Sequence, residues 1–194
     1  MLTQLGINAK KAGRVLMTAS SEKKNEALKY IAAALIENSA YIIEKNALDI
    51  EKAREKLMSE SMIDRLSLDE GRIKGIADAA LQVAALDDPC GKVISGTRRP
   101  NGLVIEKVTV PLGVIAVIFE ARPNVTVDAA ALCLKSGNCV ILRGGKEAIN
   151  SNKAMAEIMR GALAKAGLPE DCIQLVEDTT RESATALMRM NGYV

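Results

Sequence analysis

Histidine is absent from the 194 residues of this chain, and aromatic residues make up only 2% of them. Without histidine, the chain cannot contain a Ser-His or Cys-His catalytic pair or a histidine-ligated metal. The scarcity of aromatic residues disfavours a base-stacking surface for RNA. No hydrophobic run approaches the length of a membrane span, and the N-terminus lacks the apolar segment of a signal peptide. We therefore expect a cytoplasmic protein.

Cysteine is scarce and never forms a C-x-x-C pair, which argues against a zinc site or a redox motif, and we predict no metal site. The four cysteines are Cys90, Cys133, Cys139 and Cys172. The last three lie in apolar surroundings, where reduced and buried thiols are expected. The 26 basic and 24 acidic residues are spread along the chain. This balance gives no support for a nucleic-acid or membrane-surface partner.

The composition that remains, with 48% hydrophobic and 26% charged residues, is typical of a globular protein with a real core. Residues 1–88 show only helical patterns, and we assign them to an N-terminal helical segment. Ser67 and Glu70 form an S-x-x-E capping box ahead of one of these helices. Ser20 and Ser21 are candidate N-caps for an earlier helix. The apolar residues that follow them on one helical face are Leu28, Ile31, Leu35 and Ile42.

The sequence changes character between residues 89 and 113, which we interpret as a connector followed by an edge strand and a turn. KVISGTRRPNG is rich in glycine, proline and arginine, and predicts the connector. LVIEKVTV predicts the strand. Its alternate positions are polar, so we expect this strand at a sheet edge or at a subunit contact.

Residues 114–194 alternate between short apolar strands and helices. The strands are predicted at VIAVIF (114–119), which reads as fully buried, CVIL (139–142) and IQLV (173–176). Gly137 is expected to end the helix after the first strand, and Thr179 and Glu182 form a capping box for the last helix, which runs to Gly192. This alternation predicts an α/β fold with a Rossmann-like parallel sheet and crossover helices.

Three polar loops, FEARPN, RGGKEA and EDTT, each follow one of the predicted strands. The carboxyl ends of parallel strands meet at one edge of a sheet, where open α/β sheets bind their ligands. We therefore expect these loops to converge on a single crevice.

The segments FEARPNVTVDA and ILRGG are the specific part of a resemblance that covers essentially the whole chain. The chain resembles the gamma-glutamyl phosphate reductase family (glutamate-5-semialdehyde dehydrogenases) of the aldehyde dehydrogenase superfamily. The resemblance implies NADPH-dependent reduction of gamma-glutamyl phosphate to glutamate-5-semialdehyde and phosphate, on the route to proline. It leaves open a homo-oligomer and a functional partnership with glutamate 5-kinase.

The family's nucleophilic cysteine lies in a later catalytic domain, and none of the four cysteines here stands in that motif. We therefore expect this chain to be the cofactor-binding part of a longer protein and to be inactive by itself. The final Tyr193 and Val194 resemble the start of another strand, although a compact domain with a frayed tail is the alternative. Two other functions stay open: a non-catalytic nucleotide-binding or assembly fragment, and an aldehyde dehydrogenase relative with a non-phosphorylated substrate.

Asn124 matches the superfamily asparagine whose side-chain amide helps to hold the developing oxyanion, so the resemblance implies a catalytic oxyanion donor. A fixed amide N–H can aim a hydrogen bond at charge that appears only in the transition state. The alternative is an N-cap for a helix that starts at Val125. Both roles are compatible, because capping uses the carbonyl oxygen and leaves the amide NH₂ free.

Arg122 stands near a position where many superfamily members have an aromatic residue. A guanidinium can bind a phosphate or a carboxylate through two parallel hydrogen bonds. Our hypothesis is that Arg122 is a substrate-binding residue that receives the acyl phosphate. The alternative is a structural salt bridge at the mouth of the crevice.

Arg143, Gly144, Gly145 and Lys146 follow the second predicted strand and match by position the superfamily loop that contacts the adenosine ribose of the cofactor. Two cations beside glycines that let the backbone approach would favour a 2′-phosphate, and therefore NADPH over NADH. The alternative is an ordinary turn with solvated charges.

Overall fold

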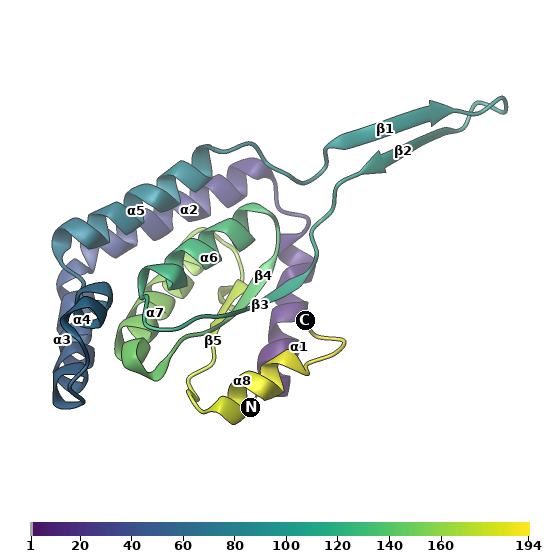
Figure 1. Ribbon diagram of the computed structural model, residues 1–194. Coiled ribbons are helices and arrows are strands. Elements are labelled where there is room, and N and C mark those ends of the chain that lie inside the picture. Colours follow the sequence, from purple (N-terminus) through teal and green to yellow (C-terminus); the bar gives the residue numbers. More distant parts are fainter. Residues whose placement is uncertain (1) are drawn as a thin grey trace.

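The computed structural model describes residues 2–194, and over this range it has the α/β class predicted from the sequence (Figure 1). A set of helices comes first, followed by a two-stranded hairpin and a three-stranded sheet with its connecting helices. The N-terminal helices are α1 (Leu2–Leu16), α2 (Ser21–Glu37), α3 (Ser39–Glu55), α4 (Glu60–Leu66) and α5 (Glu70–Ala85). Within residues 2–194, no helix is both long enough and apolar enough to cross a lipid bilayer.

Helix α2 begins at a predicted cap, because the Ser20 hydroxyl accepts a hydrogen bond from the Lys23 N–H at 3.2 Å. The single helical face predicted to continue to Ile42 is wrong, since Asn38 ends α2 and Ile42 lies on α3. The Asn38 side-chain NH₂ donates to the Ala34 carbonyl at 2.8 Å and so completes the last turn of α2. The core residues predicted on α2 are all fully buried: Leu28, Ile31 and Leu35.

The capping box predicted at Ser67 and Glu70 is wrong, because α5 starts two residues later than the box requires. Asp69 is the N-cap, and its carboxylate accepts a hydrogen bond from the Arg72 N–H at 2.7 Å. Ser67 instead ends the short helix α4, where its hydroxyl donates to the Ile63 carbonyl at 2.7 Å. The sequence pattern did not reveal α4 as a separate helix.

Strands β1 (Val93–Arg98) and β2 (Val104–Val108) pair antiparallel and project from the body of the molecule as a hairpin, which we call the arm (Figure 1). The connector predicted for KVISGTRRPNG is therefore wrong over its first half, whereas the following strand is confirmed as β2. The turn closes where the Arg99 N–H donates to the Leu103 carbonyl at 2.8 Å, and Gly102 takes the positive φ of 87° that this turn needs. Both strands are exposed along their whole length, since they pair only with each other.

Asp88, between α5 and the arm, fixes the foot of the arm to α2. The Lys24 ammonium lies 2.6 Å from the Asp88 carboxylate, and the side chain of this lysine is only 3% exposed. The Ser21 hydroxyl and the Cys90 N–H also donate to the carboxylate, at 2.6 and 2.9 Å. Burial alone would raise the pKa of Asp88, but the hydrogen bonds from Lys24, Ser21 and Cys90 outweigh it and lower the pKa to about 2.

The three-stranded sheet is parallel throughout, as predicted, with the order β3-β4-β5. Its strands are β3 (Val114–Ile118), β4 (Cys139–Arg143) and β5 (Ile173–Leu175). The central strand β4 is buried, but β3 is an edge strand and half-buried. The prediction of a fully buried first strand is therefore wrong, because β3 lies at the edge of the sheet and the crossover helices cover it less than they cover β4 and β5.

Helices α6 (Asn124–Lys135) and α7 (Ile149–Lys165) connect the parallel strands and pack on one face of the sheet, while α1 packs on the other (Figure 1). The Gln174 side chain of β5 ties α1 to the sheet by donating to the Leu5 carbonyl at 2.9 Å. Gly137 ends α6 as predicted, with a φ of 71°.

The last helix, α8 (Arg181–Met188), is capped by Thr180, whose hydroxyl accepts a hydrogen bond from the Ser183 N–H at 3.2 Å. The predicted capping box of Thr179 and Glu182 is wrong, because the helix starts one residue later than that box requires. The helix also ends at Met188, earlier than the predicted stop. Two short 3₁₀ helices complete the structure: η1 (Lys146–Ala148) and η2 (Glu170–Cys172).

Candidate functional site

The loops that follow the three parallel strands touch one another. The Phe119 N–H donates to the Arg143 carbonyl at 3.0 Å, which brings the ends of β3 and β4 together. The Arg143 guanidinium then donates to the Thr179 and Thr180 carbonyls, at 2.6 and 2.7 Å, and so joins the end of β4 to the loop after β5. A Cβ at Gly145 would lie 3.3 Å from the Glu120 backbone, so this glycine allows the loops to pack closely. The expected meeting of the loops is present.

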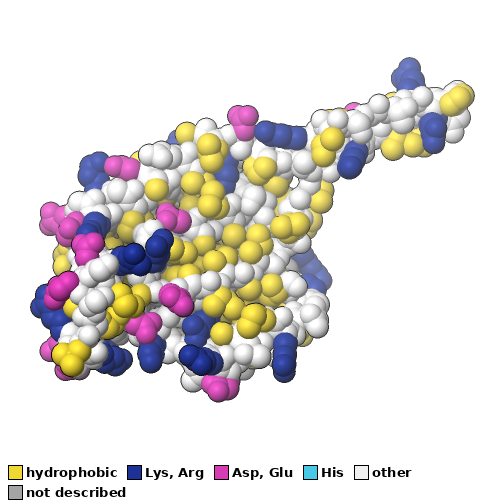
Figure 2. All heavy atoms as spheres, viewed as in Figure 1, with side chains coloured by type: hydrophobic (Ala, Val, Ile, Leu, Met, Phe, Trp, Pro, Cys, Tyr) yellow, Lys and Arg dark blue, Asp and Glu magenta, His cyan; other side chains and the backbone are white. Residues whose placement is uncertain are grey.

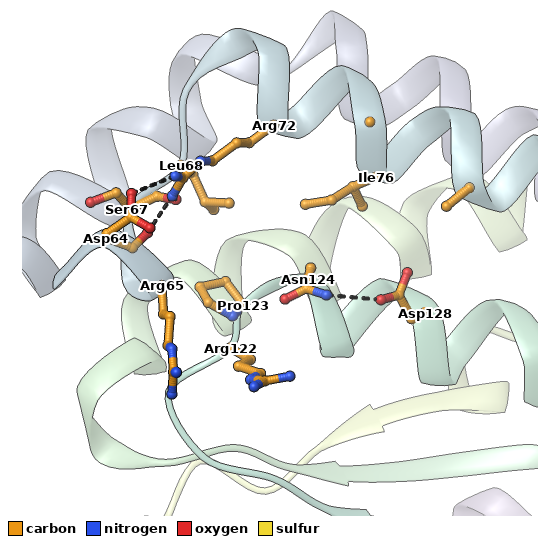
Figure 3. A pocket seen from close by; sticks show the side chains of 12 residues that line it. Asp64, Arg65, Ser67, Leu68, Arg72, Ile76, Arg122, Pro123, Asn124 and Asp128 are labelled. Atoms are coloured by element: carbon orange, nitrogen blue, oxygen red, sulfur yellow. Dashed lines mark hydrogen bonds and ion pairs between the residues drawn. The ribbon is translucent and has the colours of Figure 1, made fainter. Parts of the chain in front are cut away.

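The loops do not, however, share the single crevice that the sequence predicted. A cavity of about 470 Å³ lies between α4, α5 and the start of α6, and we call it the α4–α6 cavity (Figure 3). Arg122 and Asn124 line it, but the described residues that line it include none of Arg143–Lys146. Asn124 lies in the first turn of α6 and lines the cavity together with residues of α5 (Figure 3).

The Asn124 side chain donates to the Asp128 carboxylate at 3.0 Å, one helical turn further along α6 (Figure 3). The predicted N-cap is wrong, because Asn124 is itself the first helical residue and Pro123 occupies the cap position. An ionised carboxylate only accepts hydrogen bonds, so the amide nitrogen must face Asp128. Burial raises the pKa of Asp128, and the Asn124 hydrogen bond offsets only part of that effect. One of the two amide N–H groups is thereby left for another acceptor.

The Arg122 side chain is exposed at the α4–α6 cavity. Over residues 2–194 its guanidinium makes no ion pair, so the predicted alternative of a structural salt bridge is wrong for these residues. A guanidinium without a protein partner beside a cavity is free to bind an anion.

Two further arginines line the α4–α6 cavity, and the sequence pointed to neither. Arg72 of α5 lies 2.6 Å from the Asp64 carboxylate and also donates to the Ser67 carbonyl at 2.9 Å, so it is committed to the protein (Figure 3). Arg65 of α4 has no hydrogen-bond or ion-pair partner for its side chain within the described chain. No local spacing could have identified Arg65, because its relation to Arg122 exists only once α4 packs near α6.

Within the loop after β4, the two cations have different surroundings. Arg143 is half-buried and held by the Thr179 and Thr180 carbonyls, so the alternative of a turn with solvated charges is wrong for this residue. Its Nε is buried and has no hydrogen-bond partner among the described residues. Lys146 begins η1 and is exposed. Lys146 is therefore the cation of this loop that can meet a ligand without first losing a protein contact.

Helix α7, which follows this loop, is capped by a carboxylate from another helix. Asp49 of α3, only 2% exposed, accepts hydrogen bonds from the Ser151 N–H at 2.8 Å and the Ser151 hydroxyl at 2.7 Å. The Asn150 side chain donates to the same carboxylate at 2.7 Å. A carboxylate at a helix N-terminus is stabilised by the free N–H groups and the helix dipole. The partial positive charge at the N-terminus of α7 is thus already balanced by the Asp49 carboxylate. Through this contact, α3 holds the loop after β4 in place.

None of the cysteines lies at the α4–α6 cavity in the described part of the chain. Cys133, Cys139 and Cys172 are buried free thiols, as predicted from their apolar surroundings. Burial raises the pKa of Cys133 to about 11, and it also raises the pKa of Cys90. Because the thiolate is the nucleophilic form, these environments disfavour nucleophilic chemistry at both thiols.

Comparison with known proteins identifies the family to which this architecture belongs. The model of the aldehyde dehydrogenase family matches residues 6–193, which is nearly the whole chain. The chain belongs to the aldehyde dehydrogenase family. A probable aldehyde dehydrogenase from Listeria monocytogenes shares the fold, with a TM-score of 0.72 and 17% sequence identity, covering 97% of this chain and 39% of that one.

The more similar members of the aldehyde dehydrogenase family are gamma-glutamyl phosphate reductases. The protein of that name from Clostridium perfringens is 56% identical over 189 residues, which are 97% of this chain and 46% of the relative. The chain therefore spans about half the length of the curated relatives it matches.

Solved structures agree with this relation. The gamma-glutamyl phosphate reductase from Thermotoga maritima matches with a TM-score of 0.98 and 42% identity, covering 100% of this chain and 47% of that one. The enzyme of the same name from Saccharomyces cerevisiae matches with a TM-score of 0.89 and 37% identity, covering 98% of this chain and 49% of that one. The N-terminal helices, the arm and the parallel sheet thus belong to a fold shared with these two reductases.

Proposed function

We propose that this chain is the cofactor-binding part of an NADPH-dependent gamma-glutamyl phosphate reductase, which forms glutamate-5-semialdehyde for proline synthesis in the cytoplasm. The observation that carries the proposal is the pairing of Asn124 with Arg122 at one cavity, an amide donor beside a guanidinium that has no anionic partner within residues 2–194. The relatives named above are reductases of this kind.

In the proposed mechanism, the second N–H of Asn124 donates to the oxygen of the acyl carbon as negative charge develops there. Asp128 fixes the amide in position through the hydrogen bond at 3.0 Å. Arg122 binds the phosphate and stabilises it as it leaves. The nucleophilic thiol comes from outside this chain, since the cysteines here lie away from the cavity.

For the cofactor, we assign the loop of Arg143, Gly144, Gly145 and Lys146. Lys146 is exposed and supplies a cation for the 2′-phosphate, whereas Gly144 and Gly145 are buried and let the loop pack against the Asn152 side chain and the Glu120 backbone. Arg143 holds the loop against Thr179 and Thr180. When bound, NADPH supplies the hydride that converts the acyl group into an aldehyde.

The experiment that tests the function joins this chain to the C-terminal half of the Clostridium perfringens relative. We expect the chimera to form NADPH from NADP⁺, phosphate and glutamate-5-semialdehyde, the reverse of the biosynthetic reaction. The isolated chain is expected to show no turnover in the same assay. Turnover by the isolated chain would refute the assignment of the nucleophile to another segment, and an inactive but folded chimera would refute the function.

We extend the proposal to assembly as a homo-oligomer through the arm. The large apolar residues of the arm are exposed to solvent, and Figure 2 shows hydrophobic side chains along the arm. They include Val93, Ile94, Leu103, Val104 and Ile105. A two-stranded hairpin is marginal in water by itself, so a partner strand or surface would stabilise it. A partnership with glutamate 5-kinase belongs to the same proposal, because an acyl phosphate hydrolyses readily and is best transferred directly.

A second candidate function is a non-catalytic nucleotide-binding or assembly fragment. The position of the thiols away from the α4–α6 cavity favours it. The two functions differ in the chimera experiment, because only the reductase gains turnover when the C-terminal half of the relative is joined to this chain.

A further inference from the structure

The α4–α6 cavity carries an excess of positive charge that the protein itself does not neutralise. The charged residues that line it are Asp64, Arg65, Arg72, Arg122 and Asp128. Asp64 pairs with Arg72 at 2.6 Å, and Asp128 accepts the Asn124 amide at 3.0 Å. Arg65 and Arg122 remain, and neither guanidinium has an ion-pair partner in the described part of the chain.

The two free guanidiniums come from different elements, and both residues line the same cavity (Figure 3). Arg65 extends from α4, and Arg122 precedes the first turn of α6. Two like charges at one cavity repel, and an anion bound in the cavity reduces the repulsion. The volume of about 470 Å³ is within the range of small-metabolite sites.

A phosphoryl group suits this arrangement better than a single carboxylate does. A phosphate carries close to two negative charges at neutral pH and has several acceptor oxygens, so it can accept a fork of hydrogen bonds from each of two arginines. A carboxylate has one charge and would leave one guanidinium uncompensated. Arg72 cannot bind the phosphoryl group in this way, because its guanidinium is already bound to the Asp64 carboxylate and the Ser67 carbonyl.

We propose that Arg65 is a second phosphate-binding residue, which forms with Arg122 a two-arginine clamp on the phosphoryl group of the substrate. This inference rests on the proposed function, since it assigns that phosphoryl group to the acyl phosphate. Asn124 shields the neighbouring Asp128 carboxylate through its hydrogen bond and reduces its repulsion of the bound anion. Arg65 thereby helps to select phosphorylated over non-phosphorylated substrates.

The clamp is tested with this chain and inorganic phosphate, using isothermal titration calorimetry. Arg65→Ala and Arg122→Ala are each expected to weaken phosphate binding about tenfold to a hundredfold, the usual effect of removing one charge-assisted pair. Arg189→Ala is the matched control. Arg189 is exposed, lies near the C-terminal end of the sequence and does not line the cavity. Phosphate binding by Arg65→Ala that equals that of the parent chain, or no binding by the parent chain, overturns the clamp.

Two additional variants separate recognition from folding. Arg65→Lys keeps the charge but loses the planar fork, so we expect a loss of affinity smaller than that of Arg65→Ala. Thermal unfolding followed by circular dichroism is expected to be the same for all variants, because Arg65 and Arg122 are exposed. A lysine variant with the phosphate affinity of the parent chain overturns the forked clamp, and a lowered unfolding temperature for both Arg65 variants assigns Arg65 a structural role and also overturns it.

The bound phosphoryl group could belong to the substrate or to the cofactor, and a competition experiment distinguishes them. We expect NADP⁺ to leave the bound inorganic phosphate in place and Lys146→Ala to leave phosphate affinity unchanged. Displacement of phosphate by NADP⁺ would instead assign the arginines to the cofactor and overturn the proposal.

The same variants in the chimera separate this inference from the proposed function. With an active chimera, Arg65→Ala is expected to raise the KM for phosphate about tenfold or more while leaving the KM for NADP⁺ unchanged. An active chimera with an unchanged KM for phosphate refutes the clamp and keeps the reductase. Phosphate binding that depends on Arg65 in a chain whose chimera stays inactive keeps the clamp and refutes the reductase.

Discussion

At the scale of single residues, Asn124 combines a fixed position with an unused donor. One amide N–H donates to Asp128 at 3.0 Å, the other has no protein partner among the described residues, and the Asn124 side chain lines the α4–α6 cavity (Figure 3). In the chimera, Asn124→Ala is expected to lower kcat about a hundredfold or more, because the donor acts on charge present in the transition state. Steady-state kinetics would measure this, with Asp128→Asn as a milder companion because its amide oxygen can still accept from Asn124. A kcat unchanged by Asn124→Ala would rule out the oxyanion role.

Lys146 and Arg143 share a loop, but the structure predicts different effects for their removal. Lys146→Ala is expected to reduce the preference for NADPH over NADH about tenfold, the effect of losing one cation from a 2′-phosphate. Arg143→Ala is expected to lower stability more than selectivity, because its guanidinium holds the Thr179 and Thr180 carbonyls. Fluorescence titration with both nucleotides measures the preference, and Lys146→Arg is the control that keeps the charge. An unaltered preference in Lys146→Ala would remove the assignment.

At the scale of elements, the ion pair at the foot of the arm should make stability depend on pH. The pKa of Asp88 falls from an ordinary 3.8 to about 2 in the folded state. Folding therefore gains stability from this group above about pH 4, and the gain disappears as the pH falls through about 2. Asp88→Asn is expected to lower the free energy of unfolding by at least about 2 kcal/mol at pH 7, since it also leaves Lys24 buried without a partner.

Urea denaturation at several pH values measures this difference, which should shrink towards zero near pH 2. Asp87→Asn is the matched control, because Asp87 is 93% exposed and lies 3.6 Å from Lys92. A difference for Asp88→Asn that is as large at pH 2 as at pH 7 would contradict the assignment of the lowered pKa to the Lys24 pair.

Helix α3 supports the candidate cofactor loop through Asp49, and this support can be tested separately. Asp49→Ala leaves the N–H groups at the start of α7 without their acceptor, so we expect a loss of about 3 kcal/mol in the free energy of unfolding. Nucleotide affinity should fall as well, since the loop after β4 leads directly into α7. Glu51→Ala, an exposed position on the same helix, is the control. Unchanged stability in Asp49→Ala would show that the cap contributes little.

Sequence patterns predicted most of the elements because those patterns are local. The buried strands β4 and β5 and the helical face of α7 follow from apolar spacing over a few residues. The predictions of cap residues were less reliable. The true N-cap lies two residues after Ser67 in α5 and one residue after Thr179 in α8. The first strand of the arm was missed because glycine, arginine and proline in KVISGTRRPNG are typical of loops, and only pairing with β2 makes it a strand.

The candidate site was less predictable than the fold, because it depends on contacts between distant segments. The resemblance pointed to Asn124 and Arg122, which do line one cavity. It could not reveal Arg65, whose helix was not recognised, or Asp49, which lies about a hundred residues before the helix it caps. The prediction of a single crevice was wrong for a related reason. Strand order places the loops at one edge of the sheet, but it does not fix the direction in which each side chain points.

At the scale of the whole molecule, we expect the arm to mediate self-association. Replacing Ile94 and Val104 with lysine puts charges on its exposed apolar surface, where they are 61% and 54% exposed. Sedimentation velocity is expected to show an oligomer for the parent chain and a smaller species for this variant. Leu57→Lys, at an exposed site in the turn after α3, is the control. The same sedimentation coefficient for parent and arm variant would exclude the arm as a contact.

The separation of the arm from the body has an evolutionary consequence. Its strands pair only with each other, and the α4–α6 cavity draws on none of their residues. Substitutions in the arm can therefore accumulate without altering the lining of the α4–α6 cavity, and quaternary structure is free to diverge among descendants that keep this cavity.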